Sequence, residues 1–411
     1  MDIAAKTFDP PIPLEEAQAR LLALATPLQI QHVDLEGAVG RYLAEPLLAR
    51  RTQPAADLSA MDGYAVTAGD LAGPWKIVGE SAAGHPFTGQ FAKGEAVRVS
   101  TGAIMPADAD AVILQEDLDR TDDTLSLSGE APIPPHKHIR RCGMDFTTGR
   151  EVMPAGIAIG PAQIALALTS GHKHLPVHRR PRVVVIDSGD ELASDPEACE
   201  AHQVPASNGA MLVAMVRCLA VDSSRLGPVP DTMTDLIAAF DRAHDADVIV
   251  TSGGASVGDH DLVRPALEAW GAQLDFWRVA IKPGKPILVA TRERHHRRQI
   301  IIGLPGNPVS SLVTAYHFLL PLLRSLLGSH HPIPFTIPAR LGGELAPTGN
   351  RREFLRGYWD GRTVVAQSIQ DSGALGAMAA SNVLIDRPAH SPAAGAGDEV
   401  RVFLLQNGGI A

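Results

Sequence analysis

The alternation of strand-like and helix-like segments in the second half of this 411-residue chain constrains its fold most. Between residues 182 and 327, short β-branched runs are separated by segments with a helical apolar period. The pattern predicts strands at 182–187, 221–226, 247–251 and 274–281, and helices at 208–219, 232–244, 261–270 and 308–326. Alternation at this spacing is typical of a mostly parallel sheet covered by helices on both faces. A three-layer α/β domain is therefore predicted here.

The remaining sequence has a different texture. Residues 11–50 and 161–175 carry a helical period, whereas 51–150 and the tail from 336 consist of short β-type runs between glycines. We therefore expect a multidomain α/β chain. Its predicted parts are a helical linker domain (1–50 and 151–180), a β-rich insertion domain (51–150), the α/β domain (181–328) and a small C-terminal β-barrel domain (335–411).

Composition narrows the classes of function. The formal net charge of −10 argues against a general nucleic-acid partner. No apolar run approaches the roughly 18 residues of a membrane span, and the first residues lack a signal-peptide layout, so we expect a cytoplasmic protein without a membrane partner. The three cysteines are far apart and form no CxxC pair, which indicates neither a disulfide framework nor a zinc site.

Two clusters allow more than one interpretation. The basic run 292–298 resembles a nucleic-acid patch in isolation, but its place between two predicted strands favours a solvated hairpin tip. His172, His174 and His178 suggest either a metal site or a solvated face of the linker. Because no carboxylate or cysteine lies nearby at ligand spacing, the solvated face is favoured.

Glycine- and proline-rich loops follow the predicted strands of the α/β domain, at 188–192, 252–261 and 304–308. Ligands of an open parallel sheet bind beyond the carboxyl ends of its strands, so we expect these loops at one rim. Backbone N–H groups left unpaired in such turns can hold an anion. The loop 282–286 adds two lysines, and 252–261 adds two aspartates of metal-ligand type. Together they predict a site for a phosphorylated or oxyanionic substrate with a divalent cation.

Seven short motifs, in this order, resemble those of the MoeA and gephyrin E-domain family, the molybdopterin molybdenumtransferases. They are Ser59-Ala60-Met61-Asp62-Gly63-Tyr64-Ala65, Ser100-Thr101-Gly102-Ala103, Arg140-Arg141-Cys142-Gly143-Met144-Asp145, Ser188-Gly189-Asp190-Glu191-Leu192, Ser252-Gly253-Gly254-Ala255-Ser256-Val257-Gly258-Asp259, Lys282-Pro283-Gly284-Lys285-Pro286 and Leu304-Pro305-Gly306-Asn307-Pro308. The resemblance implies an elongated four-domain chain that forms a homodimer. Its α/β domain would be a molybdopterin-binding domain similar to a smaller pterin-adenylating protein (MogA-like).

The same resemblance implies an activity. The chain would insert molybdate into adenylylated molybdopterin with release of AMP, using Mg²⁺, and so act in molybdenum cofactor biosynthesis. A molybdopterin adenylyltransferase would be its upstream partner. Two alternatives stay open: the chain is itself a molybdopterin adenylyltransferase, which would leave the β-rich domain without a role, or it is a non-catalytic pterin-binding scaffold.

Roles of individual residues also follow from the resemblance. The catalytic residues would be Asp62, Thr101, Glu191, Asp231, Asp261 and Lys282. Among them, Glu191, Asp231 and Asp261 would hold Mg²⁺. The substrate-binding residues would be Asp145, Ser188, Gly189, Asp190, Gly253, Gly254, Ser256, Arg278, Lys285, Pro305, Gly306, Asn307, Pro308 and Ser372. Asp62, Thr101 and Asp145 would reach the cleft of the partner subunit.

Two of these motifs also have a purely structural interpretation. Asp62-Gly63 could be the central pair of a type I′ turn. Residues 304–308 could be a loop that leads into a helix, with Pro308 in the first turn.

Overall fold

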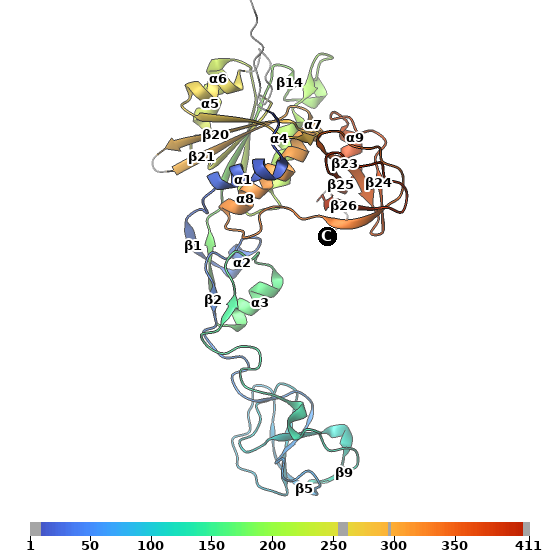
Figure 1. Ribbon diagram of the computed structural model, residues 1–411. Coiled ribbons are helices and arrows are strands. Elements are labelled where there is room, and N and C mark those ends of the chain that lie inside the picture. Colours follow the sequence, from blue (N-terminus) through green and yellow to red (C-terminus); the bar gives the residue numbers. More distant parts are fainter. Residues whose placement is uncertain (1–9, 254–261, 295–296, 406–411) are drawn as a thin grey trace, which may run out of the picture.

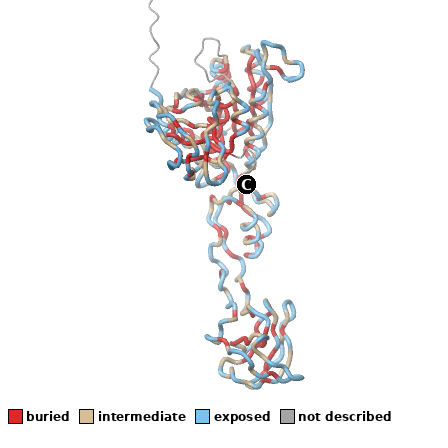
Figure 2. Tube along the Cα trace, turned by 90° about the vertical axis from the view of Figure 1, so that its right-hand side faces the viewer, coloured by how far each residue is buried: buried red, intermediate tan, exposed pale blue. Residues whose placement is uncertain are grey.

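The protein is long and thin (Figure 1). The computed structural model describes residues 10–253, 262–294 and 297–405. The α/β domain and the C-terminal β-domain lie side by side at one end, a narrow linker leads away from them, and a β-rich module forms the other end. Buried residues concentrate in the α/β domain, and exposed residues predominate along the linker (Figure 2). The predicted multidomain α/β architecture is confirmed.

The α/β domain is built on one six-stranded sheet. In spatial order its strands are β16 (Asp222–Val229), β13 (Arg182–Ser188), β17 (Val248–Ser252), β21 (Arg297–Leu304), β20 (Pro286–Arg294) and β18 (Gln273–Arg278). The first four are parallel, and β20 is antiparallel to both β21 and β18. The predicted strands are therefore confirmed to within a few residues. The described residues of the basic run, 292–294 and 297–298, lie in the β20–β21 hairpin, as predicted, and residues 295–296 lie outside the described part of the chain.

Helices cover both faces of this sheet, which confirms the three-layer prediction. One face packs against α4 (Ser207–Val216), α7 (Pro308–Thr314) and α8 (Leu320–Leu326), and the other against α5 (Met233–Arg242) and α6 (Val263–Ala269). A π-helical segment, Ala315–Leu319, joins α7 to α8. The combined helix Pro308–Leu326 is long and apolar enough to span a membrane, but 89% of it is buried inside the protein. Its apolar composition is thus explained by its place in the core.

The first helix, α1 (Leu14–Leu24), packs on the α/β domain although the sequence pattern grouped it with the linker. Its buried residues Leu14, Ala17 and Leu21 form one stripe at helical spacing and belong to the same core as α8. Gln18 Nε2 also donates a hydrogen bond of 2.9 Å to the carbonyl oxygen of His317. The linker therefore has few helices of its own.

The linker consists of two short antiparallel pairs and two helices around a small apolar core. Its elements are β1 (Ile30–Asp34), α2 (Leu35–Ala38), β2 (Leu47–Leu48), β11 (Glu151–Met153), α3 (Pro161–Thr169) and β12 (His174–His178). The helix predicted at 161–175 ends early, because Gly171 adopts a φ of 98° and the following residues pair with β1.

The histidines of this region are not a solvated face, so that prediction was wrong for two of the three. His172 and His178 are 5% and 9% exposed. His172 Nε2 lies 2.9 Å from the carbonyl oxygen of Leu48, and His178 Nδ1 makes a similar contact with Leu28. Both rings therefore tie the linker's segments together, and only His174 faces solvent.

Two β-domains complete the chain. The β-rich module contains a six-stranded sheet in the order β7 (Ala111–Leu114), β4 (Gly63–Val66), β6 (Glu95–Val99), β5 (Trp75–Ser81), β9 (Thr124–Leu127) and β8 (Leu118–Thr121). A separate pair joins β3 (Leu58–Ser59) to β10 (Ile139–Arg140). Trp75 and Leu125 are central to its core and fully buried.

The C-terminal domain is a closed barrel, as predicted. Its strands are β23 (Arg352–Trp359), β24 (Thr363–Ala366), β22 (Ile337–Leu341), β26 (Glu399–Leu404) and β25 (Val383–Arg387), and β25 closes the ring by pairing with β23. A short strand of the α/β domain, β19 (Ile281–Lys282), pairs in parallel with β23. The helix α9 (Leu375–Ala379) lies over this junction beside α7. Main-chain hydrogen bonds therefore join the two domains.

His317 gives this junction a pH-dependent stability. Its ring is buried against Phe354 and Phe403, with centroids 4.1 and 4.9 Å away, and burial lowers its pKa from 6.5 to about 3, with Arg352 adding to the effect. The folded protein keeps the ring neutral while the unfolded chain binds a proton, so stability is lost as pH falls from 6.5 toward 3. We expect the free energy of unfolding to fall by about 1 kcal/mol between pH 7.5 and pH 5.5 from this group alone.

Urea unfolding at the two pH values, compared with His317→Phe, measures this contribution. The variant should lack about 1 kcal/mol of the pH dependence. His136→Asn, a change at an exposed histidine of the β-rich module, should leave the dependence unchanged. An equal pH dependence in His317→Phe and wild-type protein would contradict the assignment.

Candidate active site

The carboxyl ends of the parallel strands bring the predicted loops together at one rim. β13 ends at Ser188, β17 at Ser252 and β21 at Leu304. The Gly189 N–H donates to the carbonyl oxygen of Val229 at the end of β16 (3.1 Å), and Gly253 N–H donates to that of Leu304 (3.1 Å). The rim faces away from the linker, near β14 (Leu192–Ala193) and β15 (Val204–Pro205) (Figure 1). The expected convergence of the loops is thus observed.

Glycines allow these loops to approach closely. Gly253 has a φ of 100°, and a Cβ there would lie 3.3 Å from the carbonyl oxygen of Ser188. A Cβ on Gly306 would lie 3.9 Å from the Cα of Gly253. Asn208 Nδ2 donates to the Gly306 carbonyl oxygen at 2.6 Å and so anchors the third loop to α4. Backbone groups of Ser188, Gly253 and Gly306 therefore form one continuous surface.

Carboxylates gather on one side of this surface. The Asp231 N–H donates to Asp190 Oδ1 at 3.0 Å. Burial raises the pKa of Asp231, and the negative charges of Asp190 and Glu191 raise it further. Like charges held together favour a cation between them. Within the described residues no three side chains are arranged as a complete metal site. The predicted residues Gly254, Ser256 and Asp261 lie outside the described part of the chain.

Positive charge reaches the same rim from the antiparallel edge of the sheet. Arg278 is the last residue of β18 and pairs with Pro286, the first residue of β20. Because β20 is antiparallel to β21, its first residue lies at the end of the sheet where β21 ends, and Arg278 therefore lies at the rim. Lys282, in β19, is half-exposed, and its Nζ lies 3.1 Å from Glu353 Oε1 of the barrel. The Val279 N–H donates to the backbone carbonyl oxygen of Lys285 at 2.8 Å and so fixes this loop. Basic residues and carboxylates therefore lie toward the same end of the sheet.

The barrel adds a serine to the third loop. Asn307 Nδ2 donates to Ser372 Oγ at 3.0 Å, and the Val309 N–H donates to the carbonyl oxygen of Ser372 at 3.1 Å. Pro305 and Pro308 flank this contact, and α7 begins at Pro308, so the helix-start interpretation of the motif is also correct. Ser372 thus lies beside the third rim loop.

One pair at the rim, the buried Asp187 and the exposed Arg225, was missed from the sequence. Asp187 is 1% exposed and accepts hydrogen bonds from Gly209 N–H (2.8 Å) and Arg225 Nε (2.7 Å). Arg225 Nη2 in turn donates to the carbonyl oxygen of Ala206 at 2.6 Å. Burial raises the pKa of Asp187 despite the opposing effect of Arg225. The pair holds the first rim loop to the start of α4. Its only sequence signal is the position of Asp187 directly before Ser188.

The predicted residues of the β-rich module lie far from the rim of the same chain. Asp62 Oδ1 accepts hydrogen bonds from the N–H (2.7 Å) and the Oγ1 (3.1 Å) of Thr101. The exposed Asp145 lies where the chain returns toward the linker, and its N–H donates to the Gln53 carbonyl oxygen at 3.1 Å. The module and the α/β domain occupy opposite ends of the molecule in Figures 1 and 2. One chain therefore does not bring the two groups together.

The turn interpretation of Asp62-Gly63 is wrong. A type I′ turn needs positive φ at both residues, and neither is among the residues with positive φ. Gly63 instead begins β4, where a Cβ would lie 2.1 Å from the carbonyl oxygen of Ile113 in the neighbouring strand. Glycine is required there by the close approach of β7.

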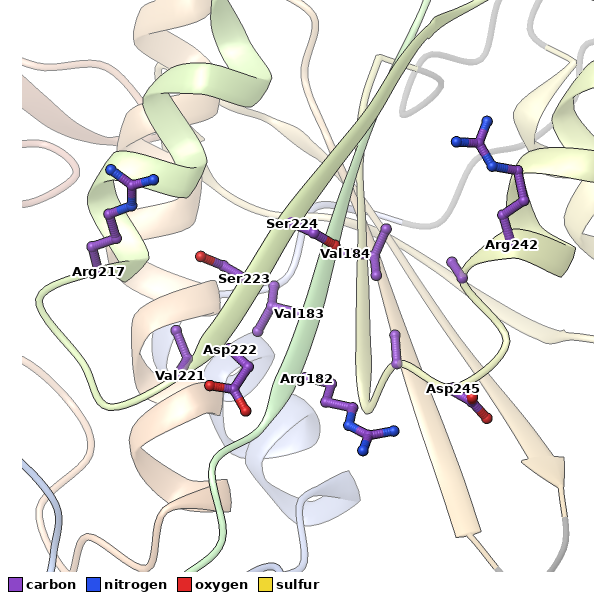
Figure 3. A pocket seen from close by; sticks show the side chains of 12 residues that line it. Arg182, Val183, Val184, Arg217, Val221, Asp222, Ser223, Ser224, Arg242 and Asp245 are labelled. Atoms are coloured by element: carbon purple, nitrogen blue, oxygen red, sulfur yellow. The ribbon is translucent and has the colours of Figure 1, made fainter. Parts of the chain in front are cut away.

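A pocket of about 540 Å³ lies at the amino ends of the parallel strands, opposite the rim (Figure 3). It is lined by the first residues of β13 and β16, and Arg182 and Asp222 project from those strands beside each other. None of the predicted site residues lines it. The rim, and not this pocket, is therefore the candidate active site.

Family models match three consecutive parts of the chain. The MoeA N-terminal region (domain I and II) matches residues 12–171, a probable molybdopterin binding domain matches 184–325, and the MoeA C-terminal region (domain IV) matches 338–405. A molybdopterin molybdenumtransferase of Haemophilus influenzae is 35% identical over 84% of this chain and 85% of its own length. The chain belongs to the MoeA family.

Other members of this family agree in sequence and in shape. Molybdopterin molybdenumtransferase 2 of Mycobacterium tuberculosis is 34% identical over 91% of the chain and 94% of its own length. The crystal structure of a molybdopterin biosynthesis MoeA protein from Pyrococcus horikoshii matches with a TM-score of 0.83 and 26% identity, over 96% of this chain and 100% of that one. The MoeA-type domain arrangement therefore extends along the chain.

Proposed function

We propose that the chain is a molybdenumtransferase that inserts molybdate into adenylylated molybdopterin and releases AMP. Two relatives that align with this chain over 85% and 94% of their own length are named molybdopterin molybdenumtransferases, which supports the reaction class. The observation that carries the proposal is the rim itself. The backbone segments at Ser188, Gly253 and Gly306 approach one another closely. The carboxylates of Asp190, Glu191 and Asp231 lie beside them, and Arg278 lies at the same end of the sheet.

These residue types suit the two substrates. Molybdate is a dianion, and the adenylylated pterin carries a pyrophosphate link. Arg278, Lys282 and Lys285 would hold oxyanion oxygens, with the guanidinium able to contact two oxygens at once. Neutral backbone N–H groups of the glycine loops would add donors without becoming nucleophiles. The rim residues would thus position molybdate next to the phosphoanhydride that is cleaved.

Mg²⁺ fits the carboxylates of the same rim. Asp190, Glu191 and Asp231 concentrate negative charge: burial raises the pKa of Asp231, and the charges of Asp190 and Glu191 raise it further. Glu191 and Asp231 would hold the ion, with Asp261 as the third ligand. When bound, Mg²⁺ neutralises phosphate oxygens and stabilises the departing AMP.

The working unit that we propose is a homodimer in which the β-rich module of one chain completes the rim of the other. The support is the separation of Asp62 and Thr101 from the rim within one chain, together with the elongated shape. A molybdopterin adenylyltransferase would supply the substrate, and the reaction would take place in the cytoplasm. An adenylyltransferase or scaffold role would leave Asp62 and Thr101 without a function.

Release of AMP from adenylylated molybdopterin tests the reaction directly. We expect release that needs both molybdate and Mg²⁺. Lys282→Ala should raise the molybdate concentration for half-maximal release by about 10- to 100-fold, because one charged contact contributes on the order of 1.5–3 kcal/mol. Its thermal midpoint should stay close to that of the wild type, because an exposed residue changes stability by within roughly 0.5 kcal/mol.

Lys173→Ala, a change at an exposed lysine of the linker, is the matched control and should leave the molybdate dependence unchanged. AMP release by the wild type at the same rate with and without molybdate would overturn the proposed reaction. Unchanged molybdate dependence in Lys282→Ala would remove Lys282 from the site.

A further inference from the structure

A cluster of arginines lies where the linker joins the α/β domain, at the amino ends of the parallel strands and opposite the rim. A pocket of about 190 Å³ there is lined by Gln31, Asp222 and five arginines: Arg41, Arg179, Arg180, Arg182 and Arg297. The arginines come from a linker loop, from the segment that enters β13, and from the β20–β21 hairpin. The pocket adjoins that of Figure 3, with which it shares Arg182 and Asp222.

Arg41 is the unusual member of this cluster. Its side chain lines the pocket, yet the residue is only 6% exposed, and its Nε and Nη1 are buried without a hydrogen-bond partner among the described residues. Burial lowers the pKa of Arg41, and the nearby charge of Arg180 lowers it further, with Asp222 opposing both. Buried charged donors are almost always paired, because an unpaired guanidinium loses its hydration without compensation.

The protein's own carboxylates do not balance the cluster. Arg179 is paired with Asp247, with 2.6 Å between Nη2 and Oδ1. Arg180 is paired more loosely with Asp222, with 3.8 Å between Nη1 and Oδ1. In the described part of the chain, Arg41, Arg182 and Arg297 take part in no ion pair. Three guanidinium groups without an ion pair among the described residues therefore line one small pocket, in which Asp222 is the one carboxylate of the lining.

We propose that this pocket binds a small tetrahedral dianion, either inorganic phosphate, sulfate or the phosphate group of a monoester. Oxygens of such an anion would accept hydrogen bonds from Arg41 on the linker and from Arg182 and Arg297 on the α/β domain. Because these arginines belong to both sides of the joint, the anion would hold the linker to the α/β domain. The site is separate from the rim and does not depend on the proposed reaction.

Calorimetric titration of the full chain with sodium phosphate or sodium sulfate, at constant ionic strength set with chloride, tests the proposal. We expect saturable binding and a rise in the thermal midpoint, which chloride alone does not produce. Binding of both anions indicates recognition of the tetrahedral dianion, and binding of phosphate alone indicates a phosphoryl ligand. A response equal to that of chloride overturns the proposal.

Variants locate the bound anion. Arg41→Met keeps an unbranched apolar stem and should weaken phosphate binding by at least tenfold, and Arg182→Met, at an exposed side chain, should weaken it several-fold without affecting folding. Asp222→Asn should tighten binding, because it removes the competing carboxylate. Arg98→Met, an exposed arginine of the β-rich module, is the matched control and should bind as the wild type does. Wild-type affinity in both Arg41→Met and Arg182→Met would place the anion elsewhere and end the assignment.

Discussion

An equimolar mixture of Asp62→Asn and Glu191→Gln chains is expected, after subunit exchange, to regain about a quarter of the wild-type rate of AMP release. Each variant alone should lose about 30- to 150-fold, since a charged contact in a partly dry site contributes about 2–3 kcal/mol. Random subunit exchange makes half of the dimers mixed. In each mixed dimer one of the two composite sites keeps both carboxylates, which gives the expected quarter.

The separation of the two groups within one chain is the reason for this expectation. Asp62 is fixed by Thr101 at the far end of the molecule, whereas Glu191 lies at the rim of the α/β domain. A mixture of Glu191→Gln and Asp231→Asn chains is the matched control, because both lesions fall in the rim of their own chain and no mixed dimer has an undamaged rim. Subunit exchange is followed with a tagged chain. Exchange without recovery in the first mixture would show that Asp62 does not act on the rim of the other chain.

Asp187→Ala is expected to lower the free energy of unfolding by about 3 kcal/mol, although Asp187 touches no substrate in the proposed site. The change leaves the Gly209 N–H without its acceptor and removes the carboxylate that orients Arg225. Arg225 then holds the Ala206 carbonyl oxygen alone. The first rim loop and the start of α4 should therefore loosen together.

Denaturant unfolding measures the loss, and hydrogen exchange at the Gly209 amide measures its local cause. That amide should exchange much faster in Asp187→Ala than in the wild type. Asp275→Ala, an exposed aspartate on β18, is the matched control and should change stability by within roughly 0.5 kcal/mol. Normal stability with unchanged Gly209 exchange would show that the Asp187–Arg225 pair does not hold the loop.

Local periodicity predicted most of the secondary structure. The strand at 182–187 and the helix at 232–244 formed almost where the pattern placed them, because the strand is a continuous apolar run buried on both faces and the helix carries one apolar stripe. The helix predicted at 161–175 was too long. Residues 174–178 have a pairing partner in β1 that local pattern does not reveal, and tertiary pairing overrides helical propensity there.

Long-range contacts decided what periodicity left open. The buried state of His172 and His178 depends on carbonyl groups of Leu48 and Leu28, which are more than a hundred residues away in sequence. The packing of α1 on α8 and the pairing of Lys282 with Glu353 arise in the same way. None of these partners has a sequence signal, because each is set by how segments far apart in the chain pack against one another.

The sequence by itself determined the kinds of domain and the position of the rim. Alternation of strands and helices indicates a parallel sheet, and loops that follow parallel strands meet at one end of the sheet, as Ser188, Gly253 and Gly306 do. Only the tertiary structure decided that Asp62 and Thr101 lie at the end of the molecule far from the rim, and that Arg41 is buried among other arginines. Distances between domains depend on the linker's path and its packing, which no local pattern of residues encodes.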